Sequence, residues 1–190
     1  MSKPNESNAP LDIEELMERI RKEVTLRRQV GITELPPRAP ACRYELGTVL
    51  KFGQGGNASD HTRLGWSHPE DGFTWSDGPA TELFFTFDRP PGDLVLSFRA
   101  RPLLHAGIAA QQVSAKWNGA VVGVWNIQDA GEYFTLILSH LTESSESGVL
   151  RFHIPQAFSP ISKGLGADSR SLGLAFNELI LRPASELGFK

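Results

Sequence analysis

Two tryptophans and two carboxylates in the segment 65–78 are the residues of this chain best suited to bind a ligand. Trp66 and Trp75 could form an aromatic platform for a sugar ring, while Glu70 and Asp77 could accept hydrogen bonds from its hydroxyl groups. The segment contains too little aliphatic content for a core strand or helix, so we predict a shaped loop. In the alternative interpretation both indoles are buried at one end of a β-sandwich and Glu70 pairs with an arginine.

The turn-rich segment 159–176 is the second shaped stretch of the chain. Its Asp168 and Arg170 could contact a ligand or could instead organise the loop, with the carboxylate accepting hydrogen bonds from backbone amides. We expect this segment to meet 65–78 in space, with Glu70 near Arg170. The predicted ligand-binding residues are therefore Trp66, Glu70, Trp75, Asp77 and Arg170.

The acidic residues of the first segment also raise the question of glycoside hydrolysis. That reaction uses two carboxyl groups about 5–10 Å apart, and Glu70, Asp71 and Asp77 are close in sequence. Acidic residues in turn-rich segments are, however, commonly turn formers. No nucleophile motif is present, so we predict no catalytic residue and favour a chain without enzymatic activity.

Other motifs do not indicate a cofactor. The glycine-rich segment 52–57 is not followed by Gly-Lys-Ser/Thr or by a helix pattern, so it predicts a loop between strands and not a phosphate-binding site. The single cysteine and the separated histidines lack the spacing of a zinc site. A structural calcium ion held by loop carboxylates remains an open alternative, and no cofactor is predicted.

Composition excludes several classes of partner. The formal net charge is -3 and no run of Lys and Arg exceeds two residues, so nucleic acid is not an expected partner. No stretch approaches the roughly 18 apolar residues of a membrane span. The single Cys42 and the polar start of the chain, which lacks the apolar stretch of a secretory signal, lead us to expect a cytoplasmic protein.

The chain divides into four predicted parts. Residues 1–10 are a disordered tail, 11–30 an amphipathic helix, 31–41 a proline-rich linker, and 42–185 a β-sandwich domain. The helix begins with a capping box, and its narrow apolar stripe could dock onto a partner protein or a second copy of the chain. The stripe consists of Leu16, Met17, Ile20 and Val24.

After residue 44 the hydrophobic pattern changes from a helical period to alternation. Leu94, Leu96 and Phe98 share one strand face while Ser97 and Arg99 lie opposite, and similar patterns recur along the chain. The dipeptide 118–119, Asn-Gly, predicts a two-residue hairpin turn. With about eight to ten short strands and no helix pattern after residue 30, the sequence predicts an all-β fold, an antiparallel, jelly-roll-like β-sandwich preceded by one helix.

The segments 66–78 and 159–174 together resemble a β-sandwich accessory domain of bacterial glycosyltransferases and phosphoglycerol-transferase-like proteins that build surface polysaccharides. The resemblance covers roughly 44–183, and the 190 residues contain no transferase domain. It implies a non-catalytic, carbohydrate-binding-like module that binds a glycan or glycan-bearing carrier, with a glycosyltransferase as a further partner. The alternatives are a protein-interaction adaptor that docks or dimerises through the helix and, third, a small carbohydrate-active hydrolase.

Overall fold

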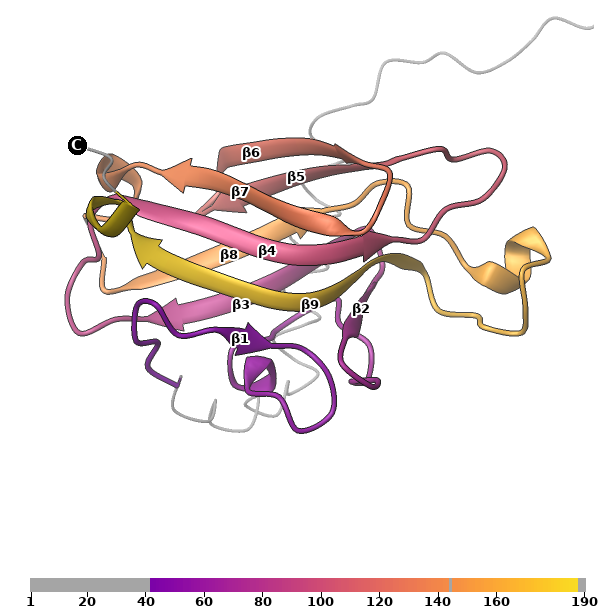
Figure 1. The fold of residues 1–190 in the computed structure, drawn as a ribbon, viewed down its shortest axis with the longest axis horizontal. Coiled ribbons are helices and arrows are strands. Elements are labelled where there is room, and N and C mark those ends of the chain that lie inside the picture. The colour runs from indigo at the N-terminus through magenta and orange to yellow at the C-terminus, as the bar shows by residue number, and fades with distance from the viewer. Residues whose placement is uncertain (1–41, 144, 188–190) are drawn as a thin grey trace, which may run out of the picture. The chain divides into compact units, whose positions relative to one another are not determined.

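The computed structural model describes residues 42–143 and 145–187. The predicted tail, helix and linker lie outside these residues, so the helix and its apolar stripe stay predictions. The described residues form nine strands in two antiparallel sheets (Figure 1). The predicted β-sandwich is confirmed.

One layer of the sandwich is a four-stranded sheet. Its strands follow the order β3 (Ala80–Thr86), β8 (Ser147–His153), β5 (Gln111–Trp117) and β6 (Ala120–Ile127). The turn between β5 and β6 is the predicted one, since Asn118 and Gly119 both have positive φ angles, 47° and 93°. A two-residue hairpin needs that conformation at both positions, and Asn-Gly adopts it at low cost.

The other layer is a five-stranded sheet, which faces the viewer in Figure 1. Its main path is β1 (Leu50–Lys51), β9 (Leu172–Pro183), β4 (Leu94–Pro102) and β7 (Gly131–Ile137), and the short β2 (Thr74–Asp77) also pairs with β9. The long β9 therefore pairs with three strands from the first half of the described chain, and it connects the segments that the sequence analysis singled out.

Alternation of side chains builds the core between the two layers. Leu94, Leu96 and Phe98 of β4 are almost fully buried, whereas Ser97 and Arg99 lie on the opposite, outer face of the sheet, as predicted. Phe98 is in ring contact with aromatic side chains from both layers, and the partners are Trp125, Tyr133, Phe152 and Phe176. Apolar burial on this scale is the main stabilising contribution to such a fold.

Helical structure in the described residues is limited to four short 3-10 turns. They are η1 (Ala58–Asp60), η2 (Ser139–Leu141), η3 (Pro160–Lys163) and η4 (Ala184–Leu187). The glycine-rich segment 52–57 is a loop between β1 and η1, in agreement with the sequence analysis. None of the helices within 42–143 and 145–187 has the length and hydrophobicity needed to cross a bilayer.

Candidate functional site

The segment 65–78 forms an irregular hairpin and not only a loop. Its outgoing arm is β2, which pairs with β9 and is largely buried, so the expectation of a loop without a core strand is wrong for these four residues. The two arms are joined by backbone hydrogen bonds, including Ser67 N to Trp75 O at 3.0 Å and Glu70 N to Phe73 O at 2.8 Å. Gly72, with φ of 74°, forms the turn between them. Pairing with β9 stabilises a sequence with few aliphatic residues as a strand.

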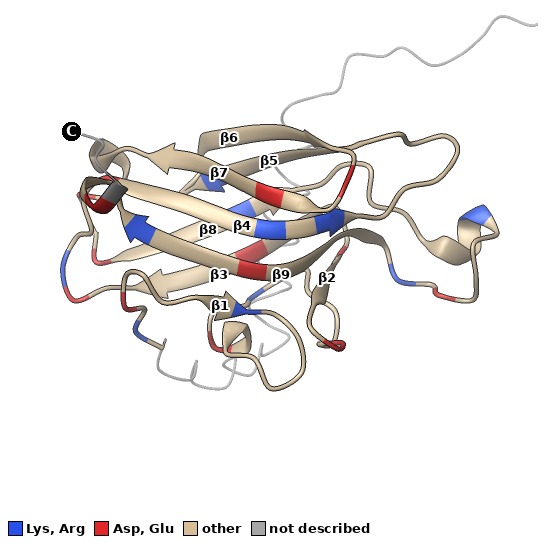
Figure 2. Cartoon of the chain, in the orientation of Figure 1, with Lys and Arg blue, Asp and Glu red and all other residues tan. Residues whose placement is uncertain are grey.

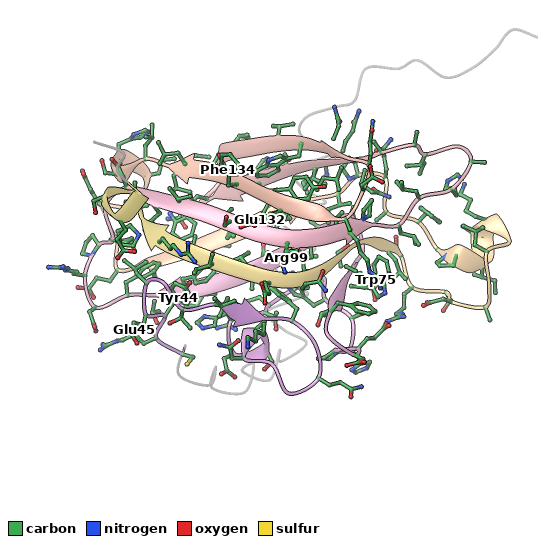
Figure 3. All side chains as sticks on the ribbon, in the orientation of Figure 1. Tyr44, Glu45, Trp75, Arg99, Glu132 and Phe134 are labelled. Atoms are coloured by element: carbon green, nitrogen blue, oxygen red, sulfur yellow. The ribbon has the colours of Figure 1, made fainter. Side chains whose placement is uncertain are left out.

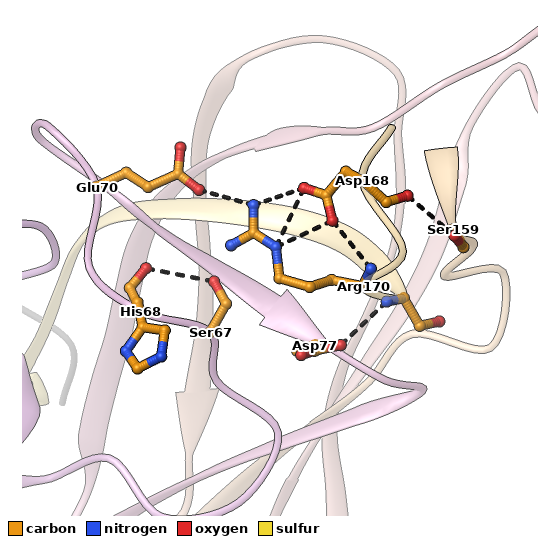
Figure 4. Close-up of polar contacts among 8 residues, drawn as sticks. Ser67, His68, Glu70, Asp77, Ser159, Asp168 and Arg170 are labelled. Carbon is orange, nitrogen blue, oxygen red and sulfur yellow. Dashed lines mark hydrogen bonds and ion pairs between the residues drawn. The ribbon is translucent and has the colours of Figure 1, made fainter. Parts of the chain in front are cut away.

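Arg170 ties the hairpin to the segment before β9. Its Nη2 donates to Glu70 Oε1 at 3.1 Å and to Asp168 Oδ2 at 2.6 Å, while its Nε contacts both Asp168 oxygens at 3.1 Å (Figure 4). Asp77 accepts a hydrogen bond from the backbone N–H of Ser171 at 3.0 Å. We call these contacts of Glu70, Asp77, Asp168 and Arg170 the clasp. The expected meeting of Glu70 and Arg170 is confirmed.

The clasp shifts the protonation equilibria of its charged groups. Hydrogen bonds from the Arg170 side chain and backbone lower the pKa of Asp168, and the hydrogen bond to Asp168 raises the pKa of Arg170. Both shifts favour the charged forms. Glu70 is paired with Arg170, and Asp77 accepts a hydrogen bond from the Ser171 amide. Both carboxylates therefore have structural roles in the clasp.

Both indoles are engaged with neighbouring groups, although Trp66 is only half-buried and lines a hollow of about 200 Å³. Trp66 stacks on Phe52 with ring centroids 5.0 Å apart and donates from Nε1 to Glu82 O at 2.8 Å. Trp75 is 9% exposed, and the Arg101 guanidinium lies over its ring, 5.4 Å from the centroid. The structural interpretation accounts for these contacts, and ligand binding by the five predicted residues stays a prediction.

The metal-ligating side chains of the described residues form no metal centre. Within residues 42–143 and 145–187, no group of three or more His, Cys, Asp and Glu side chains is arranged to hold a metal ion. His153 is exposed on the outer face of the four-stranded sheet. There it lines a hollow of about 410 Å³ together with Gln112, Ser114 and Asn126.

The outer face of the five-stranded sheet carries a groove that the sequence analysis did not find. Two hollows meet at Arg99 and Glu178, which line both of them. The larger, of about 460 Å³, is also lined by Gln54 and Asn177, among others. The smaller, of about 190 Å³, adds Ser97, Glu132, Ile180 and Arg182. We call the two hollows together the sheet groove.

Aromatic side chains stand on the sheet face to either side of the groove residues. The register places Phe134 opposite Ser97, one row from Arg99 and Glu132, and 71% of Phe134 is exposed. Beyond Arg99 along β4 is Arg101, which lies over the Phe73 ring at 4.4 Å from the centroid. Figure 3 labels Phe134, Glu132, Arg99 and Trp75 across this face.

Polar groups in the sheet groove are only partly engaged with one another. Arg99 and Glu178 approach to 3.8 Å, and both side chains are more than 40% exposed, at 58% and 42%. Ser97 donates to Glu132 Oε1 at 3.2 Å, and Asn177 donates to Gly72 O at 3.0 Å. The carboxylates and the guanidinium therefore retain unused hydrogen-bonding positions that face solvent.

The sequence holds one signal for this groove. The sequence pattern placed Ser97 and Arg99 on the polar face of their strand. In β7, Tyr133 and Thr135 are partly buried and Ile137 is fully buried, so Phe134 lies on the opposite, exposed face. An aromatic residue at the solvent-facing position of a strand indicates an exposed platform. Knowing that Phe134 lies beside Ser97 required the pairing of β4 with β7.

No family model and no curated protein matches this chain. Among solved structures, it is similar to the xylan-binding CBM22-1 domain from Paenibacillus barcinonensis Xyn10C, with 13% identity, a TM-score of 0.45, and coverage of 75% of this chain and 96% of that one. Carbohydrate-binding module CBM36 in complex with calcium and xylotriose gives 11% identity and a TM-score of 0.39, over 70% of this chain and 98% of that one.

A ruminal GH26 endo-beta-1,4-mannanase is also similar, with 9% identity and a TM-score of 0.42. The match covers 74% of this chain and 26% of the mannanase, so the chain spans about a quarter of that enzyme's length. Identities of 9–13% are too low to transfer any site residue from these three proteins.

Proposed function

We propose that the β-sandwich is a non-catalytic module that binds a glycan in the sheet groove. The observation that carries the proposal is the exposed Phe134 ring beside a row of incompletely paired polar groups, Ser97, Arg99, Glu132 and Glu178. An aromatic face can receive the C–H face of a sugar, while carboxylate, guanidinium and hydroxyl groups exchange hydrogen bonds with its hydroxyls.

The neighbourhood of Phe134 supports an interaction surface at this position. Leu136 and Leu138, at alternate positions along the same segment, are 39% and 44% exposed. Several large apolar side chains that are exposed together on one face of a soluble protein commonly mark a binding site. A groove open along the sheet suits an extended chain of sugars.

Affinity electrophoresis against soluble polysaccharides tests the proposal, with titration calorimetry on the oligosaccharides of any that bind. Xylan, galactomannan, β-1,3-glucan and polygalacturonate form a suitable first panel. Phe134→Ala should weaken binding about tenfold, the effect of losing one stacked aromatic contact.

Val124→Ala is the matched control, because Val124 is also 71% exposed but belongs to β6 of the other sheet. It should bind as the unchanged chain does. Equal binding by the Phe134→Ala and Val124→Ala variants would contradict the assignment of the site to the sheet groove. If the unchanged chain bound no member of a broad glycan panel, the proposed function itself would be contradicted.

A role in bacterial surface-polysaccharide biosynthesis in the cytoplasm is a finer proposal. It is supported by the resemblance of the segments 66–78 and 159–174 to accessory domains of that class. Genes for polysaccharide enzymes beside the gene for this chain would support it, and cell fractionation that finds the chain outside the cytoplasm would contradict the location.

Docking through the predicted helix is a separate proposal, with a glycosyltransferase or a second copy of the chain as the partner. Its basis is the apolar stripe that includes Ile20, which lies outside the described residues. Ile20→Asp in the full chain should lower the mass measured by sedimentation if a second copy docks there. An unchanged mass together with unchanged capture of the transferase would contradict docking.

A further inference from the structure

Cationic side chains recur along the five-stranded sheet, although the whole chain has a formal net charge of -3. Figure 2 shows blue segments on β1, β4 and the end of β9, with red on β7 and in β9. The cationic residues on the five strands are Lys51, Arg99, Arg101 and Arg182. The acidic ones are Glu132, Glu178 and Asp77 of β2, and Asp77 is engaged with the Ser171 amide.

The five strands carry these four cations against three carboxylates, and Asp71, exposed in the hairpin turn next to Gly72, makes the two numbers equal. Only Arg99 among the four cations has an ion pair within the described residues, the 3.8 Å contact with Glu178. Lys51, Arg101 and Arg182 are exposed and have none there. Their charge is available to a ligand.

The unpaired arginines stand toward opposite ends of the same sheet face. Arg182 is in register with Val95 of β4, while Arg101 lies six positions further along that strand. At about 3.3 Å for each residue, the rows are roughly 20 Å apart. Arg99 lies between them, so cationic groups recur along the groove direction and could meet charges on successive units of one polymer.

Arg101 is held in a position suited to anion binding. Its guanidinium lies over the Phe73 and Trp75 rings, 4.4 Å and 5.4 Å from their centroids, which restrains the side chain. The N–H groups at the edge of a stacked guanidinium remain available for a carboxylate or sulfate, which they can bind in pairs. A restrained arginine loses less conformational entropy when a ligand binds.

We propose that the sheet groove selects glycans that bear anionic groups, carboxylate or sulfate, over their neutral counterparts. This inference rests on the proposed function, because it names the class of glycan bound at the same groove. Arg101 and Arg182 are the selecting residues, and Phe134 with the uncharged polar groups binds the sugar rings that the acidic and neutral glycans share.

The test is titration calorimetry with matched pairs of oligosaccharides. Oligogalacturonate is compared with its methyl ester, glucuronoxylan fragments with their carboxyl-reduced form, and sulfated galactan fragments with the desulfated form. We expect at least one anionic member to bind more tightly than its neutral partner. The advantage should decrease between 20 mM and 300 mM salt, because exposed charges are screened.

Arg101→Gln and Arg182→Gln should each reduce affinity for that anionic member by about fivefold, the scale of an exposed charge-assisted contact, and leave affinity for its neutral partner unchanged. Arg89→Gln is the matched control, since it removes the same charge from an exposed arginine in the connection between β3 and β4. Circular dichroism confirms that each variant is folded.

The outcomes separate the two proposals. Equal binding of anionic and neutral members, or equal effects of Arg101→Gln, Arg182→Gln and Arg89→Gln, would overturn the anionic selection and leave glycan binding intact. Binding to neither member of any pair would contradict the proposed function itself. The carboxylate and sulfate pairs show which anion carries the preference.

Discussion

At the scale of single residues, Arg170 joins the hairpin to the segment before β9, and Arg101 covers the Trp75 indole. Glu70 and Arg170 were expected to meet because two polar, turn-rich segments offered few other partners of opposite charge, and their contact is 3.1 Å. The cover over Trp75 could not be predicted, because it depends on Arg101 from another strand. The exposed fraction of an indole depends on side chains that are distant in sequence, and the residues next to the tryptophan in sequence do not predict them.

Removing the guanidinium should loosen the clasp. Arg170→Met should lower the free energy of unfolding by about 1 kcal/mol, a modest cost because the paired side chains are about one-third exposed and therefore screened. Urea denaturation measures the change, with Arg89→Met as an exposed control. If the two variants are equally stable, the clasp does not stabilise the sandwich.

Trp75 should matter for stability. Trp75→Ala removes a largely buried indole packed with Leu172, Ala175 and Phe73, and should cost about 3 kcal/mol. Phe134→Ala should change stability by less than about 0.5 kcal/mol, because most of that ring already faces solvent. Thermal unfolding compares the two, and a marginal effect of Trp75→Ala would show that its packing is dispensable.

At the scale of elements, alternation predicted the long strands and the Asn-Gly dipeptide predicted the turn at 118–119, since both follow from local sequence. Alternation missed β2 because four residues in a segment rich in turn formers become a strand only by pairing with β9. The sheet groove was missed for the same reason. Its residues come from β1, β4, β7 and β9 and from loops that include Gln54 and Gly72, and only the sheet pairing brings the four strands together.

Two glycines of the four-stranded sheet should respond differently to the same substitution. In Gly148→Ala the new Cβ would lie 2.0 Å from the Trp117 ring, so the core must shift at a cost of about 1–3 kcal/mol. Gly119→Ala meets no atom within 4 Å, and its cost of about 1 kcal/mol comes from the positive φ alone. Calorimetric melting, supported by near-UV circular dichroism of the tryptophans, should show altered core packing only for Gly148→Ala; an unaltered core in that variant would contradict the steric account.

At the scale of the whole molecule, stability should be greatest between about pH 7 and pH 10. Burial lowers the pKa of His61 below its usual 6.5, so its neutral form stabilises the fold above that pH and the contribution is lost on acidification. The depressed pKa of Asp168 adds a second loss below about pH 4. Burial raises the pKa of Tyr44 to about 12, so stability decreases again above pH 10, where the unfolded chain ionises first.

Guanidinium denaturation from about pH 2 to pH 11 checks this profile. The alkaline decrease should be smaller in Tyr44→Phe, which loses the hydrogen bonds of the hydroxyl to Thr48 and Leu181 and has no group to ionise at this position. The remaining decrease comes from Tyr133, whose pKa is also raised by burial. The first acid decrease should be absent in His61→Phe. If the free energy of unfolding of both variants followed the same pH profile as that of the unchanged chain, the pH dependence would come from other groups.

Glycan binding in the sheet groove is tested most directly by NMR titration of the full chain with an oligosaccharide of whichever polysaccharide the affinity panel selects. The backbone amide signals of Ser97, Arg99, Glu132, Phe134 and Asn177 should shift with a single dissociation constant. At a ligand concentration near that constant, Phe134→Ala should reduce the shifts of the other four residues severalfold, as about tenfold weaker binding requires. Shifts confined to 65–78 and 168–170, or to the four-stranded sheet, would contradict the assignment of the site to this groove.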